Sequence, residues 1–142
     1  MIVLDANILL YAYDSASQHH VKARAWVERE FSGMQSIGLP WQTVAAFVRI
    51  MTNARLPGER LAIEEAVEVV VTWLEQPNIR LLAAGEDHWT LFRQMLVEGQ
   101  AAGPLASDAH LAALTVEYGG VLHTTDRDFA RFPALRWKNP IA

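Results

Sequence analysis

Short apolar runs alternate along the chain with longer segments that have the periodicity of amphipathic helices. The apolar runs predict strands at residues 2–4, 35–37, 79–82, 121–122 and 135–137. Because one or two helices separate successive strands, the strands should pair in parallel through right-handed crossovers. The sequence therefore predicts an α/β fold for a single domain over residues 1–142, with a central parallel sheet of four to five short strands and helices on both faces.

The predicted helices cover residues 8–11, 20–31, 41–52, 63–76 and 88–98, and a further helix begins at Asp108. Segment 63–76 has the most regular pattern, and Pro77 ends it. Its apolar residues recur at helical spacing and predict a stripe that faces the core, formed by Ile63, Ala66, Val67, Val70 and Leu74.

Four of the six aspartates stand where a predicted strand ends or a predicted helix begins. Asp5 follows the first strand, Asp126 and Asp128 follow the strand at 121–122, and Asp108 opens a helix. In open α/β sheets, ligands bind at the carboxyl ends of the strands. We therefore expect these four carboxylates to converge on one site.

Convergence of carboxylates needs compensation, because two unit charges about 4 Å apart repel by roughly 4 kcal/mol at an effective dielectric near 20. Either some of the carboxyl groups are protonated with raised pKa values, or a divalent cation lies among them. Oxygen ligands from aspartate suit a hard ion such as Mg²⁺ or Mn²⁺, which commonly binds substrate phosphate oxygens as well. The pattern indicates phosphate chemistry.

Each aspartate also has a structural explanation. Asp108 is placed to cap the helix that follows it, and an acid in a first turn is favourable with the helix dipole. Asp126 and Asp128 are placed to open a turn of helix at residues 129–131. Asp5 is harder to explain in this way, because a charge directly after an apolar strand should be partly buried and needs a partner.

Composition and charge narrow the function classes. The chain has no cysteine, which excludes disulfides and thiolate metal sites, and its five scattered histidines disfavour zinc. Met1 runs directly into the first strand, and no apolar run approaches the roughly 18 residues that a membrane span needs. We expect a cytoplasmic protein without membrane association.

The net charge of −4 argues against indiscriminate nucleic-acid binding, but its distribution favours a nuclease. Ten of the twelve basic residues are arginine, which suits bidentate phosphate contacts. No acid lies between Glu30 and Glu59 or after Asp128, and both stretches contain arginines. The first candidates for substrate contact are residues 15–22 and 49–60.

Three short motifs, in this order, resemble those of the PIN domain. They are Asp-Ala-Asn at 5–7, Asp-Ala-His-Leu-Ala-Ala at 108–113 and Thr-Thr-Asp-Arg-Asp-Phe at 124–129. Residues 41–49, 52–55 and 129–132, together with Trp137, resemble more narrowly the VapC-type toxins of bacterial toxin–antitoxin pairs. The resemblance extends over nearly the whole chain.

The resemblance implies a toxin endoribonuclease that hydrolyses RNA phosphodiesters with Mg²⁺ or Mn²⁺, by a water that the metal activates. It also implies an RNA substrate, a homodimer and a VapB-type antitoxin partner. By position, Asp5, Asp108 and Asp126 match the metal-binding acids of the family, and Asp128 matches an additional acidic position. Thr124 matches a hydroxyl residue two positions before the late aspartate.

Two positions leave alternatives open. Asn7 either orients a water or substrate oxygen or forms a turn. Ala46 stands where the general PIN pattern has a glutamate on the middle helix, so one tightly held ion plus one recruited with the substrate is the working hypothesis. The missing carboxylate also motivates a catalytically weakened RNA- or protein-binding module as an alternative. A housekeeping RNA-processing nuclease and a phosphatase are the others, although Asp-x-Asp-x-Thr is absent after the first strand.

Overall fold

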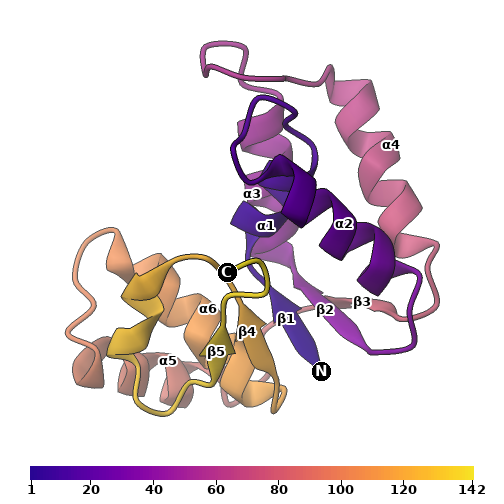
Figure 1. Ribbon diagram of the computed structural model, residues 1–142. Helices are drawn as coiled ribbons and strands as arrows, with labels where there is room; N and C mark the ends of the chain where they lie inside the picture. The colour runs from indigo at the N-terminus through magenta and orange to yellow at the C-terminus, as the bar shows by residue number, and fades with distance from the viewer.

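The structure is a computed structural model that describes all residues from Met1 to Ala142. Its central sheet, covered by helices, confirms the predicted α/β architecture. Five strands pair in parallel in the order β3-β2-β1-β4-β5 (Figure 1). The strands are β1 (Ile2–Leu4), β2 (Ile37–Pro40), β3 (Ile79–Leu82), β4 (Val121–His123) and β5 (Trp137–Lys138). The helices are α1 (Ala6–Ala12), α2 (His20–Phe31), α3 (Trp41–Met51), α4 (Ile63–Leu74), α5 (His88–Glu98), α6 (Leu105–Glu117) and the 3₁₀ helix η1 (Arg127–Arg131).

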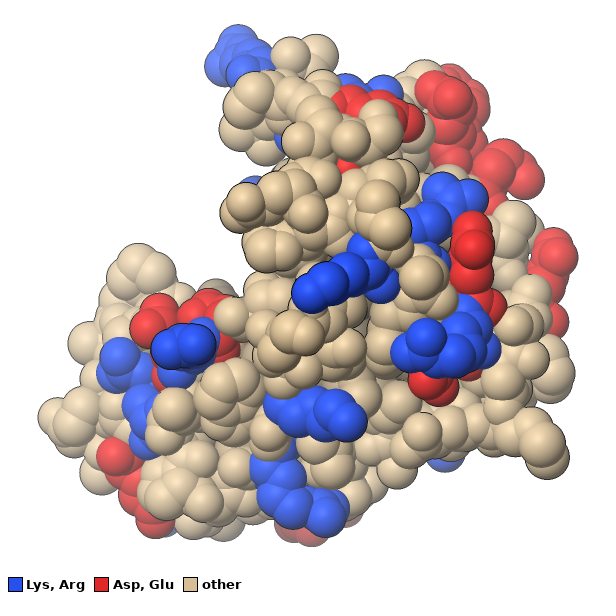
Figure 2. Space-filling view, viewed as in Figure 1, with Lys and Arg blue, Asp and Glu red and all other residues tan.

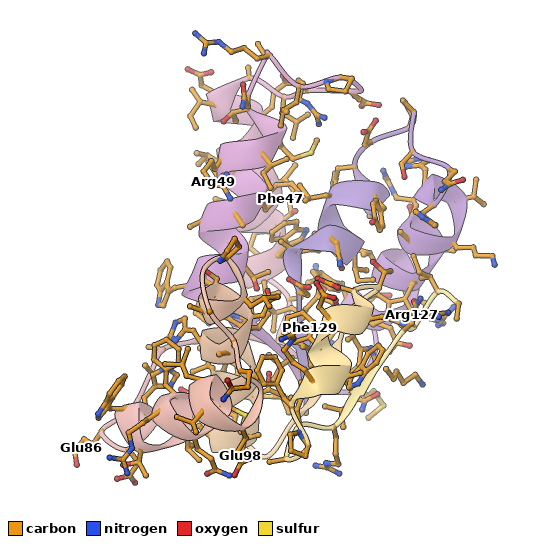
Figure 3. All side chains as sticks on the ribbon, turned by 90° about the vertical axis from the view of Figure 1, so that its left-hand side faces the viewer. Phe47, Arg49, Glu86, Glu98, Arg127 and Phe129 are labelled. Atoms are coloured by element: carbon orange, nitrogen blue, oxygen red, sulfur yellow. The ribbon has the colours of Figure 1, made fainter.

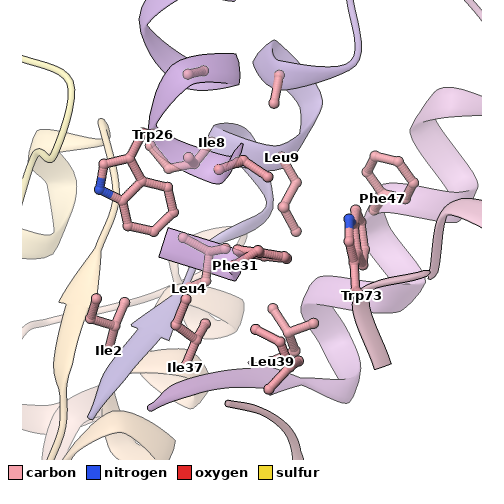
Figure 4. Packing of buried hydrophobic residues seen from close by; sticks show 14 of the residues in the cluster. Ile2, Leu4, Ile8, Leu9, Trp26, Phe31, Ile37, Leu39, Phe47 and Trp73 are labelled. Atoms are coloured by element: carbon pink, nitrogen blue, oxygen red, sulfur yellow. The ribbon is translucent and has the colours of Figure 1, made fainter. Parts of the chain in front are cut away.

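Helices cover both faces of the sheet, and each face has its own hydrophobic core. Ile2 and Leu4 of β1 belong to the core formed with α1, α2, α3 and α4 (Figure 4), whereas Val3 belongs to the core formed with α5, α6 and η1. Successive residues of a strand point to opposite faces, so the central strand is buried on both sides. This explains why β1 has a continuous apolar sequence.

Two strands lie a few residues later in the chain than their predicted positions. The strand predicted at 35–37 is Ile37–Pro40, because Ile37 pairs with Ile2 on one side and with Ile79 on the other. Gly38 is part of this strand: a Cβ at this position would lie 2.4 Å from Leu82 Cδ1. The predicted strand ended at residue 37 because glycine and proline, here Gly38 and Pro40, usually interrupt strands. The strand predicted at 135–137 is Trp137–Lys138.

The predicted core stripe of α4 is wrong for three of its five residues. Ile63, Val67 and Leu74 are 51%, 48% and 40% exposed, whereas Ala66 is buried and Val70 is half-buried. Trp73, which was not part of the predicted stripe, is buried. The helix is apolar on more than one side, so its periodicity cannot select the buried face. Trp73 selects it, because its ring packs edge-on against Phe47 with centroids 4.7 Å apart (Figure 4). None of the helices has both the length and the apolar character needed to cross a membrane.

Candidate metal centre

The candidate site lies at the edge of the sheet where the parallel strands β1, β2 and β4 end. Asp5 follows β1 directly and is the N-cap of α1, where its Oδ1 accepts a hydrogen bond of 2.8 Å from the Ala6 N–H. The Asp5 N–H donates to the His123 carbonyl at the end of β4, at 3.1 Å. Strand pairing therefore holds Asp5 beside the segment that follows β4.

Thr124 joins residues from both ends of the chain. Its buried hydroxyl donates to Asp5 Oδ2 at 2.7 Å. Thr124 Oγ1 also accepts hydrogen bonds from Asn7 Nδ2 at 3.2 Å and from the Asp126 N–H at 3.1 Å. The structure thus brings together four of the predicted site residues around one hydroxyl group.

The carboxylates of Asp108, Asp126 and Asp128 each place an oxygen within 4.8 Å of the others. Figure 3 shows oxygen atoms gathered at the start of η1, where Arg127 and Phe129 are labelled. Asp5 is not a member of this group of three, but its negative charge acts on Asp108. The four aspartates therefore converge as predicted, with Asp5 held at the side of the cluster by Thr124.

The structural explanations for these aspartates have different outcomes. Asp108 lies in the first turn of α6, which begins at Leu105, and its carboxylate accepts no capping hydrogen bond. Asp126 is the N-cap of η1, and its Oδ1 accepts from the Asp128 N–H at 2.9 Å. The capping explanation is therefore wrong for Asp108, whereas Asp126 caps a helix and belongs to the acidic cluster as well.

Burial and mutual repulsion raise the pKa values of two of the aspartates. The pKa of Asp108 is raised to about 6, chiefly by burial and then by the charges of Asp126, Asp5 and Asp128, while Arg131 lowers it. Burial also raises the pKa of Asp5, against the hydrogen bonds from Thr124 and Ala6, and the charge of Asp126 adds to the increase. The cluster is short of positive charge.

Helix α3 contributes amide and hydroxyl groups to this edge but no carboxylate. Thr43 Oγ1 donates to the Leu4 carbonyl at 2.8 Å, next to Asp5, and Gln42 Nε2 donates to the Ser107 carbonyl at 3.4 Å, next to Asp108. Ala46 is half-buried one turn further along the helix. The first turn of α3 is thus connected to the residues that precede two of the aspartates. Sequence reasoning missed Gln42, although a polar residue just after a buried strand at this edge was a usable signal.

The residues present fit a hard divalent cation. Asn7 Oδ1 and Gln42 Oε1 are buried and have no hydrogen-bond partner within the protein. Such an acceptor costs roughly 1–3 kcal/mol when it stays unpaired, so each of these oxygens is suited to a ligand or to a water held by one. Carboxylate and amide oxygens are the ligand types that Mg²⁺ and Mn²⁺ favour.

Comparison with known proteins identifies the fold family. The family model of the PIN domain matches residues 2–135. The chain belongs to the PIN-domain family. This PIN domain is 38% identical over 141 residues to ribonuclease VapC33 of Mycobacterium tuberculosis, which covers 99% of both chains. It is 37% identical over 142 residues to ribonuclease VapC37 of the same species, covering 100% of this chain and 99% of the relative. It is a VapC-type member of the family.

Solved structures agree with this assignment at the level of the fold. The PIN domain superposes on VapBC2 from Rickettsia felis, bound to a DNA fragment of its promoter, with a TM-score of 0.69 at 15% identity, covering 98% of each chain. It superposes on VapC20 of Mycobacterium tuberculosis, described as a sarcin-ricin loop cleaving toxin, with a TM-score of 0.67 at 16% identity, covering 96% and 99%.

Proposed function

We propose that the chain is a metal-dependent endoribonuclease and the toxin of a toxin–antitoxin pair. The observation that carries the proposal is the cluster of Asp108, Asp126 and Asp128, whose oxygens lie within 4.8 Å of one another. It occurs in a chain that is 36–38% identical to proteins named VapC ribonucleases. A cluster of this kind is suited to bind a cation, and a cation among carboxylates is suited to phosphodiester hydrolysis.

The four aspartates have related roles in this proposal. Asp108, Asp126 and Asp128 would hold Mg²⁺ or Mn²⁺, with Asp5 beside them. The ion, when bound, would lower the pKa of a water and neutralise charge on the phosphoryl oxygens. Thr124 orients Asp5 by donating to its Oδ2, and this hydrogen bond favours the ionised form of Asp5 against the effect of burial.

Asn7 and the carboxylates of the acidic cluster position the attacking water. The Asn7 amide donates to Thr124 through Nδ2, which leaves Oδ1 as a buried acceptor at the acidic cluster. That oxygen can accept a hydrogen bond from the water or from a ribose hydroxyl. Because water attacks, the products carry a 5′-phosphate and a 3′-hydroxyl.

The partners follow from the same assignment. Structures similar to this chain include VapBC-1 from Haemophilus influenzae and VapBC from Salmonella typhimurium bound to DNA, both complexes of a toxin with its antitoxin. We propose that this chain forms a homodimer and that a VapB-type antitoxin inhibits it. The test of the toxin role is expression in a bacterial host. Growth arrest by the wild-type chain, but not by its Asp126→Asn variant, would support a toxin over a housekeeping RNA-processing enzyme.

The decisive experiment measures cleavage of a structured RNA mixture by antitoxin-free protein. Wild-type protein with Mg²⁺ or Mn²⁺ should cut the RNA, and EDTA or the substitution Asp126→Asn should abolish cutting while the circular dichroism spectrum stays unchanged. Products with 2′,3′-cyclic phosphate ends would exclude attack by water. RNA binding without metal-dependent cleavage would favour the catalytically silent binding module.

A further inference from the structure

A groove beside the acidic cluster remains unexplained by the catalytic residues. Two hollows of about 480 Å³ each share Thr125, Asn139 and Ala142 in their walls, so they form one depression on either side of the C-terminal segment. We call this surface the tail groove and define it by Tyr11, Lys22, Thr125, Arg127, Trp137 and Lys138. Each hollow is of the size that binds small ligands, roughly 300–1,000 Å³.

The tail groove begins at the candidate metal centre. Thr125 lies between Thr124 and Asp126, both of which belong to that centre, and Arg127 lies between Asp126 and Asp128. Thr125 lines both hollows. The groove therefore lies next to that centre, and a chain molecule whose phosphate is held at the aspartates can extend toward it.

The groove is positively charged although the protein is negative overall. No aspartate or glutamate lines either hollow, in a chain with a net charge of −4. Lys22, Arg127 and Lys138 lie in its walls, and none of them forms an ion pair or a side-chain hydrogen bond.

Several other cations of the protein are paired within it. Arg24 and Arg29 form ion pairs with glutamates, and Arg131 and Arg136 donate to backbone carbonyls. Figure 2 shows Lys and Arg side chains spread over the middle of one face, beside a red group of acids on the left. The three unpaired cations of the tail groove are thus available for an anionic ligand next to the acidic site.

Aromatic rings accompany the cations. Each hollow has one half-buried aromatic residue in its wall, Trp137 in the first and Tyr11 in the second. The Tyr11 ring also contacts His19, with ring centroids 4.7 Å apart. Alternation of cations with aromatic faces is the arrangement with which proteins bind the backbone and the bases of a single strand.

We propose that the tail groove is the subsite that holds single-stranded RNA beside the cleaved phosphodiester. Lys22, Arg127 and Lys138 contact phosphates, and Trp137 and Tyr11 stack on unpaired bases. Paired bases cannot reach the rings, so the groove selects single-stranded loops or ends. The proposal rests on the proposed function, because it takes the acidic cluster as the place where the RNA is cut. An acidic protein segment could pair with the cations, but it would give the rings of Trp137 and Tyr11 no role.

The test measures binding of a fluorescein-labelled eight-nucleotide RNA by fluorescence anisotropy in EDTA, where no cleavage occurs. The groove variant is Lys22→Gln with Lys138→Gln. The matched control is Arg80→Gln with Arg93→Gln, which removes the same charge at exposed, unpaired cations on β3 and α5. Strand β3 forms the opposite edge of the sheet from β5. The groove variant should raise the Kd about tenfold, and the control should change it less than about twofold.

Salt dependence gives a second readout. Each phosphate contact to a single strand adds about 0.7 to the negative slope of log binding constant against log salt, so three contacts give about 2. The groove variant should lower the slope by about 1.4, and the control should keep it. Equal losses in both variants would show that net charge alone matters and would overturn the proposal.

Aromatic stacking is tested with Trp137→Leu and Trp137→Phe, after thermal unfolding confirms that each variant folds. The leucine variant should weaken binding of the single strand about tenfold, and phenylalanine should restore most of it. If Trp137→Leu does not fold, Tyr11→Leu replaces it. A duplex of the same sequence that binds as tightly as the single strand, or groove variants that lose only binding of poly-L-glutamate, would contradict the proposal.

The two proposals fail separately. Wild-type protein that cleaves RNA in Mn²⁺, with groove and control variants of equal Kd, would leave the nuclease intact and remove the tail groove from substrate binding. RNA binding that depends on the groove, without cleavage by wild-type protein, would leave the binding subsite and exclude the nuclease.

Discussion

The acidic cluster should destabilise the metal-free protein, and Asp108 is the residue at which this can be measured. Its pKa of about 6 lies above the ordinary value of 3.8, because of burial and of the charges of Asp126, Asp5 and Asp128. A raised carboxyl pKa contributes stability that is fully present below about pH 3.8 and is lost as the pH rises through 6. At pH 7.5 the ionised Asp108 therefore costs stability.

The magnitude follows from the difference between the two pKa values. At 1.36 kcal/mol per pKa step, the gap between 3.8 and about 6 corresponds to about 3 kcal/mol. Asp108 is partly exposed, so solvent screening reduces this to about 1–2 kcal/mol. Asp108→Asn keeps the shape of the side chain and removes the charge. It should raise the free energy of unfolding of the metal-free protein by that amount at pH 7.5.

The assay is urea unfolding followed by circular dichroism in EDTA, at pH 7.5 and at pH 3.5. At pH 3.5 Asp108 is mostly protonated in both the folded and the unfolded protein, so the advantage of the asparagine should shrink to a few tenths of a kcal/mol. The control is Asp87→Asn, because Asp87 precedes α5 without a capping hydrogen bond and lies outside the acidic cluster. It should give no gain at either pH.

Addition of Mn²⁺ should reverse the order, because wild-type protein gains stability from the bound ion and Asp108→Asn gains less. The reasoning is refuted if Asp108→Asn is no more stable than wild-type protein in EDTA at pH 7.5. An advantage of equal size at pH 3.5 would refute it as well, since it could not come from the charge.

Three further predictions follow from the site and the sheet. Thr124→Val removes the hydroxyl that joins Asp5, Asn7 and Asp126, and should weaken Mn²⁺ binding 10- to 100-fold in a calorimetric titration, whereas Thr124→Ser should stay near wild type. Ala46→Glu adds a carboxylate to α3 and should tighten Mn²⁺ binding by about tenfold while lowering stability in EDTA; unchanged binding would place Ala46 outside the ion's reach. Gly38→Ala should lower the free energy of unfolding by about 1–3 kcal/mol through overpacking against Leu82, and a wild-type urea midpoint would show that this side chain moves away freely.

The structure shows what surrounds Ala46, which stands where the general PIN pattern has a glutamate. Ala46 leaves α3 without a carboxylate, yet the first turn of the same helix is connected to Leu4 by Thr43 and to Ser107 by Gln42. Helix α3 therefore contacts the residues next to Asp5 and Asp108, although it carries no carboxylate itself. The amide oxygen of Gln42, in the first turn of α3, is buried and has no hydrogen-bond partner.

Local patterns were sufficient for the order of the elements and for the position of the acids. Apolar runs and helical spacing predicted all five strands and the helices, and the rule for parallel sheets placed Asp5 and Asp126 at one edge. These inferences depend on the side-chain periods of strands and helices, which adjacent residues determine. Resemblance of three short motifs to the PIN domain then indicated the family that the comparisons confirmed.

Tertiary structure decided the features that depend on residues far apart in the chain. Helix α4 buries Trp73 rather than the stripe of Ile63 and Val67, because only the packing against Phe47 distinguishes its apolar faces. Thr124 contacts Asp5 across 119 positions, a bond that no local pattern specifies. The sequence by itself determined which acids stand at strand ends. Folding alone decided which of them bring their carboxylates together, because side-chain distances across the sheet follow from strand register and long-range packing.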